Sequence, residues 1–357
     1  MARATVMRDL QTAVGLGVPA APLVFPIFEG VAARLAGETY HDFSTKAVAM
    51  TKVWDQSIER FDVDWAGLFV DDLFEYEPLG IEITDGPDHP YAVTQYLPAD
   101  QSTLAHLRVP NFRKDARLPA LLEAQRRIRE RWGNQIVISK SVAAPFSGLT
   151  LLCGIPEVML LVYDDPELLR RLMGFVEELA IAFSLALLAA GADVIWLGDC
   201  SASSRFLSLS AYRELALAPA QRVAAAINRA GGLVIYHAGE NKLPFLEEMA
   251  GVAPDVLSVE AGIDLAAVKR TVGSRVCLSG NLDGVHLLWH GQPPAIEAAT
   301  RHLVTEVASQ GGVIVNTGEG IPEQTPATNL TAMFRTIRAA WPHGTDADHR
   351  GARRPAN

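Results

Sequence analysis

The fold is decided by the stretch Gly191-Ala192-Asp193-Val194-Ile195-Trp196-Leu197-Gly198-Asp199. A glycine turn ends a helix and releases the chain into a short apolar run, which an aspartate follows directly. Apolar runs of this length are typical of buried strands. The stretch therefore predicts a buried strand with a polar side chain at its carboxyl end.

Seven other segments repeat this pattern of a short apolar run that carries, or runs into, a polar residue. They are 24–28 before Glu29, 66–70 before Asp71, 136–142 with Lys140 and Ser141, 233–236 before His237, 256–259 before Glu260, 276–280 before Asn281, and 313–318 before Glu319. The intervening segments are long enough for at least one helix each, as parallel crossovers require. We therefore expect an α/β fold, a single (β/α)8 TIM barrel whose chemistry gathers at the carboxyl ends of the strands.

The chain length fits one such barrel with insertions. Of the 357 residues, 1–341 are expected to form the barrel. Residues 342–357 lack large apolar side chains and are expected to be a disordered tail. Residues 72–135 break the strand–helix rhythm, and we interpret them as an insertion after the second strand that builds part of the active-site mouth.

Composition excludes several classes of function. A net charge of −10 gives no basic footprint for nucleic acid. Three cysteines without C-x-x-C spacing favour a reducing, cytoplasmic location. The most apolar helical segment, 179–190, is too short to cross a bilayer, so no membrane partner is expected. No sequence signal marks a homodimer interface, although a dimer remains compatible with this fold class.

Carboxylates crowd the end of the second predicted strand at Asp71, Asp72, Glu75 and Glu77. If residues 72–79 are helical, Asp71 and Glu75 share one face. Such carboxylates can orient a cation, bind metal or shuttle protons. We predict a catalytic role for Asp71, substrate binding for Glu75 and Glu77, and a helix-capping role for Asp72.

Four further strand ends supply candidate site residues. Asp199 and the hydroxyl of Ser201 follow the fourth strand and can contact substrate, whereas Cys200 is interpreted as an inert small residue because no partner base is evident. His237 follows the fifth strand and can bind metal or relay protons. Glu319 stands between two glycines, which suggests close approach to another group. Asn281 completes the ring.

In this order, the residues resemble the uroporphyrinogen decarboxylase superfamily, a single (β/α)8 barrel, from about Pro22 to Ala340. The most specific matches are Gly280-Asn281-Leu282-Asp283 and Gly318-Glu319-Gly320-Ile321-Pro322. The resemblance to the decarboxylases themselves is weaker. Their anion-binding arginine pair would fall at Glu29 and Arg34, and their late histidine would fall at Glu319. A polyanionic porphyrinogen would meet an acidic mouth, which is an electrostatic mismatch.

The pattern is closer to the branch of methyltransferases that exchange methyl groups with a corrinoid protein. Asp71, Glu75 and Glu77 match its second-strand pattern, and Asp199 with Ser201 matches its D-P-S-A-S pattern. Its zinc motif has one histidine and two cysteines. Here His237 remains, but Gly239 and Glu319 stand at the cysteine positions. The resemblance therefore leaves three alternatives for His237 and Glu319: zinc, another divalent metal, or no metal. Glu240, Glu260 and Asp199 are candidate third ligands.

The leading hypothesis is a methyltransferase that acts on a small O- or N-methylated, or methyl-accepting, molecule with a corrinoid protein as partner. Asp71, Asp199, His237 and Glu319 would be catalytic. Glu29, Glu75, Glu77, Ser201 and Asn281 would bind a neutral or cationic substrate. The alternatives are a divergent decarboxylase or lyase on the same barrel, and a receptor that uses the mouth only for binding.

Overall fold

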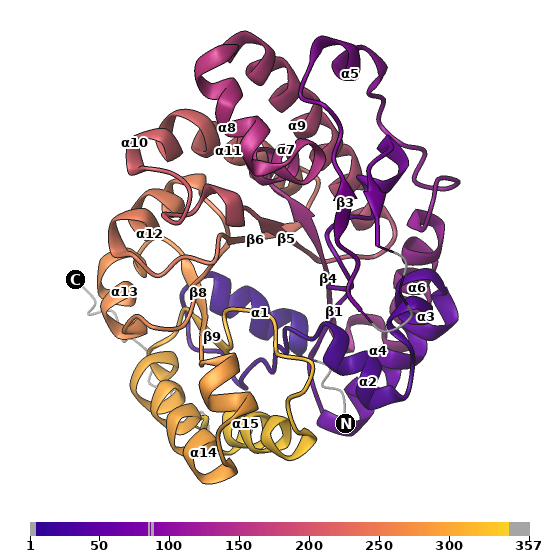
Figure 1. The fold of residues 1–357 in the computed structure, drawn as a ribbon. Helices are drawn as coiled ribbons and strands as arrows, with labels where there is room; N and C mark the ends of the chain where they lie inside the picture. The colour runs from indigo at the N-terminus through magenta and orange to yellow at the C-terminus, as the bar shows by residue number, and fades with distance from the viewer. Residues whose placement is uncertain (1–4, 85, 87–88, 343–357) are drawn as a thin grey trace, which may run out of the picture.

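A curled parallel sheet of seven strands forms the centre of the molecule (Figure 1). The structure is a computed structural model, and it describes residues 5–84, 86 and 89–342. Neighbouring strands pair in the order β1-β4-β5-β6-β7-β8-β9. Their bounds are β1 (Trp65–Gly67), β4 (Val137–Ala143), β5 (Val194–Gly198), β6 (Leu233–His237), β7 (Val256–Ser258), β8 (Cys277–Asn281) and β9 (Val313–Asn316). Each lies in one of the predicted runs, give or take a residue, so the α/β, TIM-like arrangement is confirmed.

The remaining run, residues 24–28, forms no strand. It nevertheless lies between the start of β1 and the loop after β9. On one side the Asp64 amide donates to the Val24 carbonyl at 3.0 Å, and on the other side the Ile321 amide donates to the Ile27 carbonyl at 3.0 Å. Pro26 has no amide proton for a ladder, which explains why these bonds stay isolated. The eighth position of the ring is thus filled by extended chain, and the sheet itself has seven strands.

Alternating side chains divide the apolar interior into two layers. Inside the ring, a cluster includes Trp65, Val137, Trp196, Ile235 and Ile314. The residues between them in sequence point outward into a second cluster, which packs beneath the surrounding helices. Because successive side chains of a strand point to opposite faces, this parity decides which polar residues reach the centre of the ring.

Helices surround the sheet and close one end of it (Figure 1). The helix α1 (Val6–Val14) packs Val6, Leu10 and Ala13 into the inner cluster and closes the end away from the viewer. The others are α2 (Gly30–Ala36), α3 (Tyr40–Thr45), α4 (Ala47–Phe61), α5 (Gln101–His106), α6 (Leu118–Trp132), α7 (Pro145–Cys153), α8 (Ile155–Asp164), α9 (Pro166–Ala189), α10 (Leu209–Tyr212), α11 (Ala218–Arg229), α12 (Leu243–Met249), α13 (Leu265–Val272), α14 (Pro293–His302) and α15 (Ala327–Ala340).

The helix α9 is longer than the apolar pattern predicted. It has 24 residues, and by length and composition alone it would be able to cross a membrane. In the structure it is one helix of the outer ring, with Leu172, Val176, Leu179 and Phe183 buried. Its apolar character is therefore used in packing against the sheet and neighbouring helices.

Residues 72–135 form a mixed segment between β1 and β4. The expected helix at 72–79 is wrong: only a short 3-10 turn, Glu77–Leu79, forms there. A two-stranded antiparallel ribbon follows, made of β2 (Glu82–Ile83) and β3 (Val93–Gln95), and then come α5 and α6. All but Pro342 of the tail predicted to be disordered lies outside the described residues.

Candidate functional site

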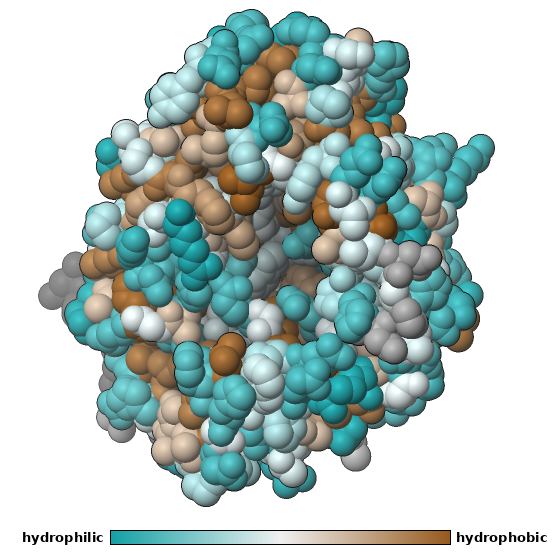
Figure 2. Space-filling model, in the orientation of Figure 1, coloured by the Kyte–Doolittle hydropathy of each residue, from teal (hydrophilic) through white to brown (hydrophobic). Residues whose placement is uncertain are grey.

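A pocket opens at the carboxyl ends of the strands, where the space-filling view shows a hollow in the middle of the face (Figure 2). It encloses about 790 Å³ of empty space, the open mouth included. Its lining consists of Ile27, Glu29, Phe69, Asp72, Ser141, Val142, Ala143, Ser147, Leu151, Trp196, Gly198, Cys200, Ser201, His237, Glu319 and Gly320. Four predicted site residues, Glu29, Ser201, His237 and Glu319, are thus brought together.

His237 is the most constrained polar side chain of the pocket. It is the last residue of β6 and points to the inside of the ring, as Ile235 does two residues earlier. Its imidazole lies against the Trp196 indole, with ring centroids 4.8 Å apart. The Ser258 hydroxyl donates to the Gly318 carbonyl at 3.2 Å and lies 3.1 Å from His237 Nδ1. Because the Ser258 hydroxyl donates its one proton to Gly318, it can only accept a hydrogen bond from Nδ1–H of His237. The other ring nitrogen, Nε2, faces the pocket.

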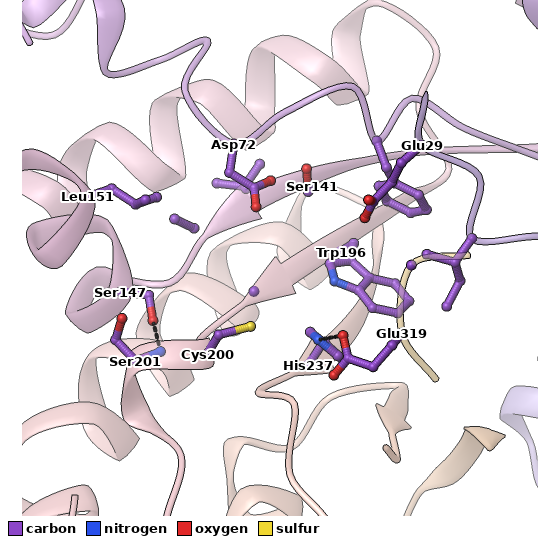
Figure 3. A pocket seen from close by; sticks show the side chains of 16 residues that line it. Glu29, Asp72, Ser141, Ser147, Leu151, Trp196, Cys200, Ser201, His237 and Glu319 are labelled. Atoms are coloured by element: carbon purple, nitrogen blue, oxygen red, sulfur yellow. Dashed lines mark hydrogen bonds and ion pairs between the residues drawn. The ribbon is translucent and has the colours of Figure 1, made fainter. Parts of the chain in front are cut away.

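The Nε2 atom of His237 pairs with the Glu319 carboxylate at 3.4 Å (Figure 3). Burial lowers the pKa of His237, but Glu319 and the Cys200 thiol outweigh burial and raise it well above its usual range. For Glu319 burial acts in the opposite direction and raises the pKa. The charges of His237 and Arg205 outweigh it and bring the pKa of Glu319 below its ordinary value. The two side chains therefore form an imidazolium–carboxylate pair that can hold and deliver a proton.

Two glycines make room for the carboxylates of this site. Gly239 has a φ of +55°, and a Cβ at that position would lie 3.0 Å from Glu319 Oε1. A Cβ on Gly320 would lie 2.4 Å from Glu29 Oε1. The prediction that the glycines beside Glu319 permit close approach is confirmed for Gly320, and the group that approaches is Glu29.

Glu29 and Asp72 form the acidic side of the pocket (Figure 3). The Glu29 side chain is open to solvent at the mouth, yet the protein atoms packed around it, with the charges of Asp72 and Glu319, raise its pKa to about 7. Within the described residues, neither carboxylate has a hydrogen bond or an ion pair, and no lysine or arginine lines the pocket. The nearest arginine to Glu319, Arg205, is paired with Glu260 at 2.6 Å. The pocket is therefore acidic, as the sequence predicted.

Asp199 lies beneath the pocket, outside its lining. It follows the inward-facing Gly198, so it has outward parity. Its carboxylate accepts from Ser147 Oγ at 2.8 Å and from the Tyr236 hydroxyl at 2.7 Å. Burial raises its pKa to about 6 against these hydrogen bonds. Asp199 thus fixes the start of α7 through Ser147, and its role towards substrate stays a prediction.

Asp71 and Asp72 lie differently from what the sequence suggested. Asp71 accepts from the Leu73 amide at 2.9 Å and binds the Arg117 guanidinium at 2.7 Å, so it does not line the pocket. Arg117 also binds Glu77 at 2.7 Å, which holds Glu77 away from the pocket as well. Arg117 directly precedes α6 and lies far from Asp71 in sequence, so it draws Asp71 and Glu77 away from the pocket. Asp72 faces the pocket.

Glu75 is fully buried and also lies outside the lining. Neither of its carboxylate oxygens has a hydrogen-bond partner. Burial raises its pKa to about 8, although the nearby Lys140 ammonium lowers it. At neutral pH it is mostly the uncharged acid, because a buried carboxylate without a partner is costly. Substrate binding by Glu75 remains a prediction that this pocket does not support.

Asn281 and the candidate third metal ligands are held by other partners. Asn281 Nδ2 donates to the Ile263 carbonyl at 2.8 Å, which fixes the loop after β7. Glu240 accepts from the amides of Ser204, Asn241 and Lys242, and Glu260 binds Arg205.

The donor set does not fit a metal of the predicted kind. Over residues 5–84, 86 and 89–342, no three His, Cys, Asp or Glu side chains are arranged to hold a metal ion. A catalytic zinc typically has three protein ligands, and His237 with Glu319 supplies two. The metal at this pair therefore remains a prediction that the arrangement does not support.

Sequence reasoning missed Asp72, Cys200, Trp196 and Phe69 as pocket residues. For Trp196, the signal was present in the strand parity, since it stands two residues from the inward Gly198. Cys200 lies in the loop after β5 and lines the pocket together with His237 of the neighbouring strand β6.

Comparison with known proteins agrees with this architecture. The family model described as uroporphyrinogen decarboxylase (URO-D) matches residues 10–340. The chain belongs to the uroporphyrinogen decarboxylase family. One relative, a uroporphyrinogen decarboxylase from Thioalkalivibrio sulfidiphilus, is 27% identical over 329 residues, which cover 87% of this chain and 89% of that protein.

Within the URO-D family, the similarity also extends to methyltransferases. The methylcobamide:CoM methyltransferase MtaA from Methanosarcina barkeri is 30% identical over 219 residues, covering 61% of this chain and 62% of that protein. The solved structure of a methyltransferase from Methanosarcina mazei superposes with a TM-score of 0.84 at 25% identity, covering 93% and 98% of the two chains. The chain is thus a URO-D superfamily member near the methyltransferase branch.

Proposed function

We propose that this protein is a methyltransferase of the URO-D family that acts on a neutral or cationic small molecule. The observation that carries the proposal is the charge of the pocket. Glu29, Asp72 and Glu319 face it, and no lysine or arginine is among its lining residues. A porphyrinogen with several carboxylates would bring like charges together in a partly buried site, which is strongly unfavourable.

The walls of the pocket suit a small molecule with both polar and apolar parts. Ile27, Phe69, Leu151 and Trp196 offer apolar surface, and the hydroxyls of Ser141 and Ser201 offer adaptable hydrogen bonds. Ser201 is held in place, because its amide donates to Ser147 Oγ at 3.0 Å. A methylated oxygen or nitrogen can thus be oriented between the serines and the His237–Glu319 pair.

The protein's own contribution to the chemistry would be proton transfer and positioning. A cationic nitrogen donor that loses its methyl group leaves as a neutral amine. A neutral oxygen or nitrogen donor, by contrast, keeps the electron pair, becomes anionic and needs a proton. The His237 imidazolium, kept protonated by Glu319, is placed to deliver it at Nε2. General acid catalysis of this kind contributes about 10²–10⁴-fold to a rate.

The methyl partner in this proposal is a corrinoid carried by another protein. Support comes from the similarity to MtaA, whose name describes transfer between a methylcobamide and coenzyme M. A corrinoid would supply the centre that exchanges the methyl group. The open mouth of the pocket, visible in Figure 2, leaves the substrate accessible from outside. A metal at His237 and Glu319 is the competing version of the proposal.

The decisive experiment incubates the purified chain with free reduced cobalamin and a panel of methylated phenols, alcohols and amines. Methyl transfer is followed by the change in visible absorption of the cobalamin. We expect turnover with a neutral or cationic donor, and a loss of about 100-fold in the His237→Gln variant. Absence of turnover across the panel, combined with loss of carboxyl groups from uroporphyrinogen, would establish the decarboxylase alternative instead.

Metal analysis separates the two versions of the site. Protein purified without chelator should contain far less than one zinc per chain, and its activity should survive dialysis against chelator. One tightly held metal per chain, lost in both His237→Gln and Glu319→Gln, would favour the metal version. The Glu177→Gln variant is the control, because Glu177 pairs with Arg222 at 2.6 Å outside the pocket.

A further inference from the structure

A fully buried lysine lies behind one of the serines that line the pocket. Lys140 belongs to β4, and its side chain is closed off from solvent. Its ammonium donates to the Asp71 carbonyl at 3.0 Å, to the Ser141 carbonyl at 2.9 Å and to the Ser141 hydroxyl at 2.7 Å. An ammonium has three protons, so these three bonds use all of them. The buried cation is therefore hydrogen-bonded to uncharged oxygens, and one of these belongs to a pocket side chain.

Ser141 is the point at which this cation meets the pocket. Along β4, Val137 belongs to the inner cluster, so Ser141 shares its inward parity and Lys140 has outward parity. Ser141 lines the pocket and Lys140 does not. Figure 3 shows Ser141 among the side chains around the hollow. The lysine charge can thus act on a bound molecule through the Ser141 hydroxyl, without lining the pocket itself.

The Ser141 hydroxyl has a proton left for a ligand. A hydroxyl has one proton and two lone pairs, and one lone pair of Ser141 accepts from Lys140. Within residues 5–84, 86 and 89–342, no oxygen or nitrogen accepts the hydroxyl proton. Ser141 is only 7% exposed, so the proton is also poorly served by bulk water. An acceptor atom in the pocket would meet a buried donor that has no other partner.

Lys140 makes this donor stronger. A hydroxyl that accepts a hydrogen bond from a cation loses electron density, so its own proton becomes a better donor. Such a donor favours an atom with a free lone pair, and most of all an oxygen that gains negative charge as a bond breaks. A protonated amine or a quaternary ammonium offers no lone pair, and the cation behind Ser141 repels it.

We propose that Ser141 binds the ether oxygen of an O-methylated substrate, and that Lys140 is the positioning residue that orients and polarises its hydroxyl. This inference rests on the proposed function, because it names the substrate class of the same pocket, uncharged methyl ethers. The methyl carbon breaks its bond to the ether oxygen and forms its new bond to the reduced corrinoid of the proposed partner. The oxygen keeps the electron pair of the broken bond, and it takes a proton as proposed above. The hydrogen bond from Ser141 strengthens as that charge develops.

The first test measures binding to the full chain, which needs no methyl transfer. The probes are anisole and ethylbenzene, which have nearly the same shape and differ by an oxygen in place of a methylene group. Headspace gas chromatography over the protein solution gives the free concentration of each probe. The ratio of the anisole affinity to the ethylbenzene affinity should fall about tenfold in Ser141→Ala and about threefold in Lys140→Met.

Two further variants serve as controls for this ratio. Ser141→Thr keeps the hydroxyl and should retain the wild-type ratio. Ser184→Ala should also leave it unchanged, because the buried Ser184 hydroxyl lies outside the pocket and donates to the Ala180 carbonyl of its own helix at 2.7 Å. The inference is overturned if Ser141→Ala, with native circular dichroism, keeps the wild-type ratio.

A double variant separates positioning by Lys140 from a purely structural role. In the Ser141→Ala background, Lys140→Met should change the ratio no further, because the lysine acts through the hydroxyl. An equal change in both backgrounds, or an equal loss of both probes, would refute the positioning role. If Lys140→Met does not fold, Lys140→Gln takes its place, since glutamine keeps two N–H donors and lacks the charge.

The cobalamin assay distinguishes this inference from the proposed function. Ser141→Ala should slow anisole about tenfold more than 4-nitroanisole in kcat, because nitrophenolate leaves readily without a hydrogen bond. Wild-type turnover of anisole by Ser141→Ala, or turnover of methylated amines alone, would refute the inference and leave the proposed function standing. A binding preference for anisole that disappears in Ser141→Ala, with no turnover of any donor, would remove the proposed function and keep Ser141 as an oxygen-binding residue.

Discussion

Two acidic regions of this protein look alike in sequence and differ in the structure. At the end of β1, Asp71 and Glu77 are held by Arg117, whose guanidinium also lies over the Phe74 ring at 4.1 Å. Within the pocket, Glu29 and Asp72 face open space, and among the described residues neither is paired with a lysine or an arginine. The first region is a structural ion-pair cluster, and the second is available to a ligand. The difference teaches that a carboxylate at a strand end is available to a ligand only where no arginine or lysine from another part of the chain forms an ion pair with it.

The largest effect is expected on removing the cation from the first region. In Arg117→Ala, Asp71 and Glu77 would keep buried or half-buried charges without a partner, because Arg117 and Asp71 have side chains only 8% and 5% exposed. The free energy of unfolding should fall by about 3–5 kcal/mol. Urea denaturation measures it. The matched control is Arg222→Ala, whose partner Glu177 forms an exposed pair, and it should cost less than about 1 kcal/mol.

Glu75 provides a test of the same region through pH. Its pKa is about 8 in the folded protein and 4.5 when unfolded, so its contribution to stability is greatest below pH 4.5 and is lost as the pH rises through 8. Between pH 6 and 7.5, wild type should lose about 2 kcal/mol more than Glu75→Gln. Denaturation curves at both pH values measure this difference. An equal pH dependence of the two proteins would show that Glu75 has a partner and is ionised.

The pocket region should show its coupling in the titration of His237. Glu319→Gln removes the charge that raises the pKa of this imidazole, so that pKa should fall by about one unit or more. Nuclear magnetic resonance of the histidine side chains follows the change. His302 is exposed at the end of α14, outside the pocket, and serves as the internal reference. If the His237 titration is unchanged, the imidazolium–carboxylate pair does not exist in solution.

The smallest effect concerns the free carboxylates themselves. Asp72 raises the pKa of Glu29, so Asp72→Asn should lower that pKa by about half a unit at the dielectric of a partly open site. Carbon-13 resonances of the glutamate carboxyls report it. High salt should shrink the difference between the variant and the wild type, because the two groups are reached by solvent. A rise in the Glu29 pKa would contradict the proposed geometry of the acidic side.

Strand pattern and parity made much of the fold predictable, and some of the site. Seven runs became strands because their apolar lengths match buried parallel strands, and the parity of Trp196 and Gly198 separates the inward His237 from the outward Asp199. The run at 24–28 failed because Pro26 cannot enter a ladder. Arg117 was beyond reach, since nothing local to Asp71 reveals a cation that lies 46 residues away in sequence. The place of Cys200 in the pocket lining was equally hidden, because it depends on neighbouring strands that are distant in sequence.

The close approach of Glu319 to Gly239 also limits what position 239 tolerates. A Cβ there would lie 3.0 Å from Glu319 Oε1, and the φ of +55° favours glycine. Because the contacted oxygen ends a flexible side chain, the carboxylate can move by a few tenths of an ångström, but it then leaves its position beside His237. A side chain at 239 should therefore disturb the site more than the fold.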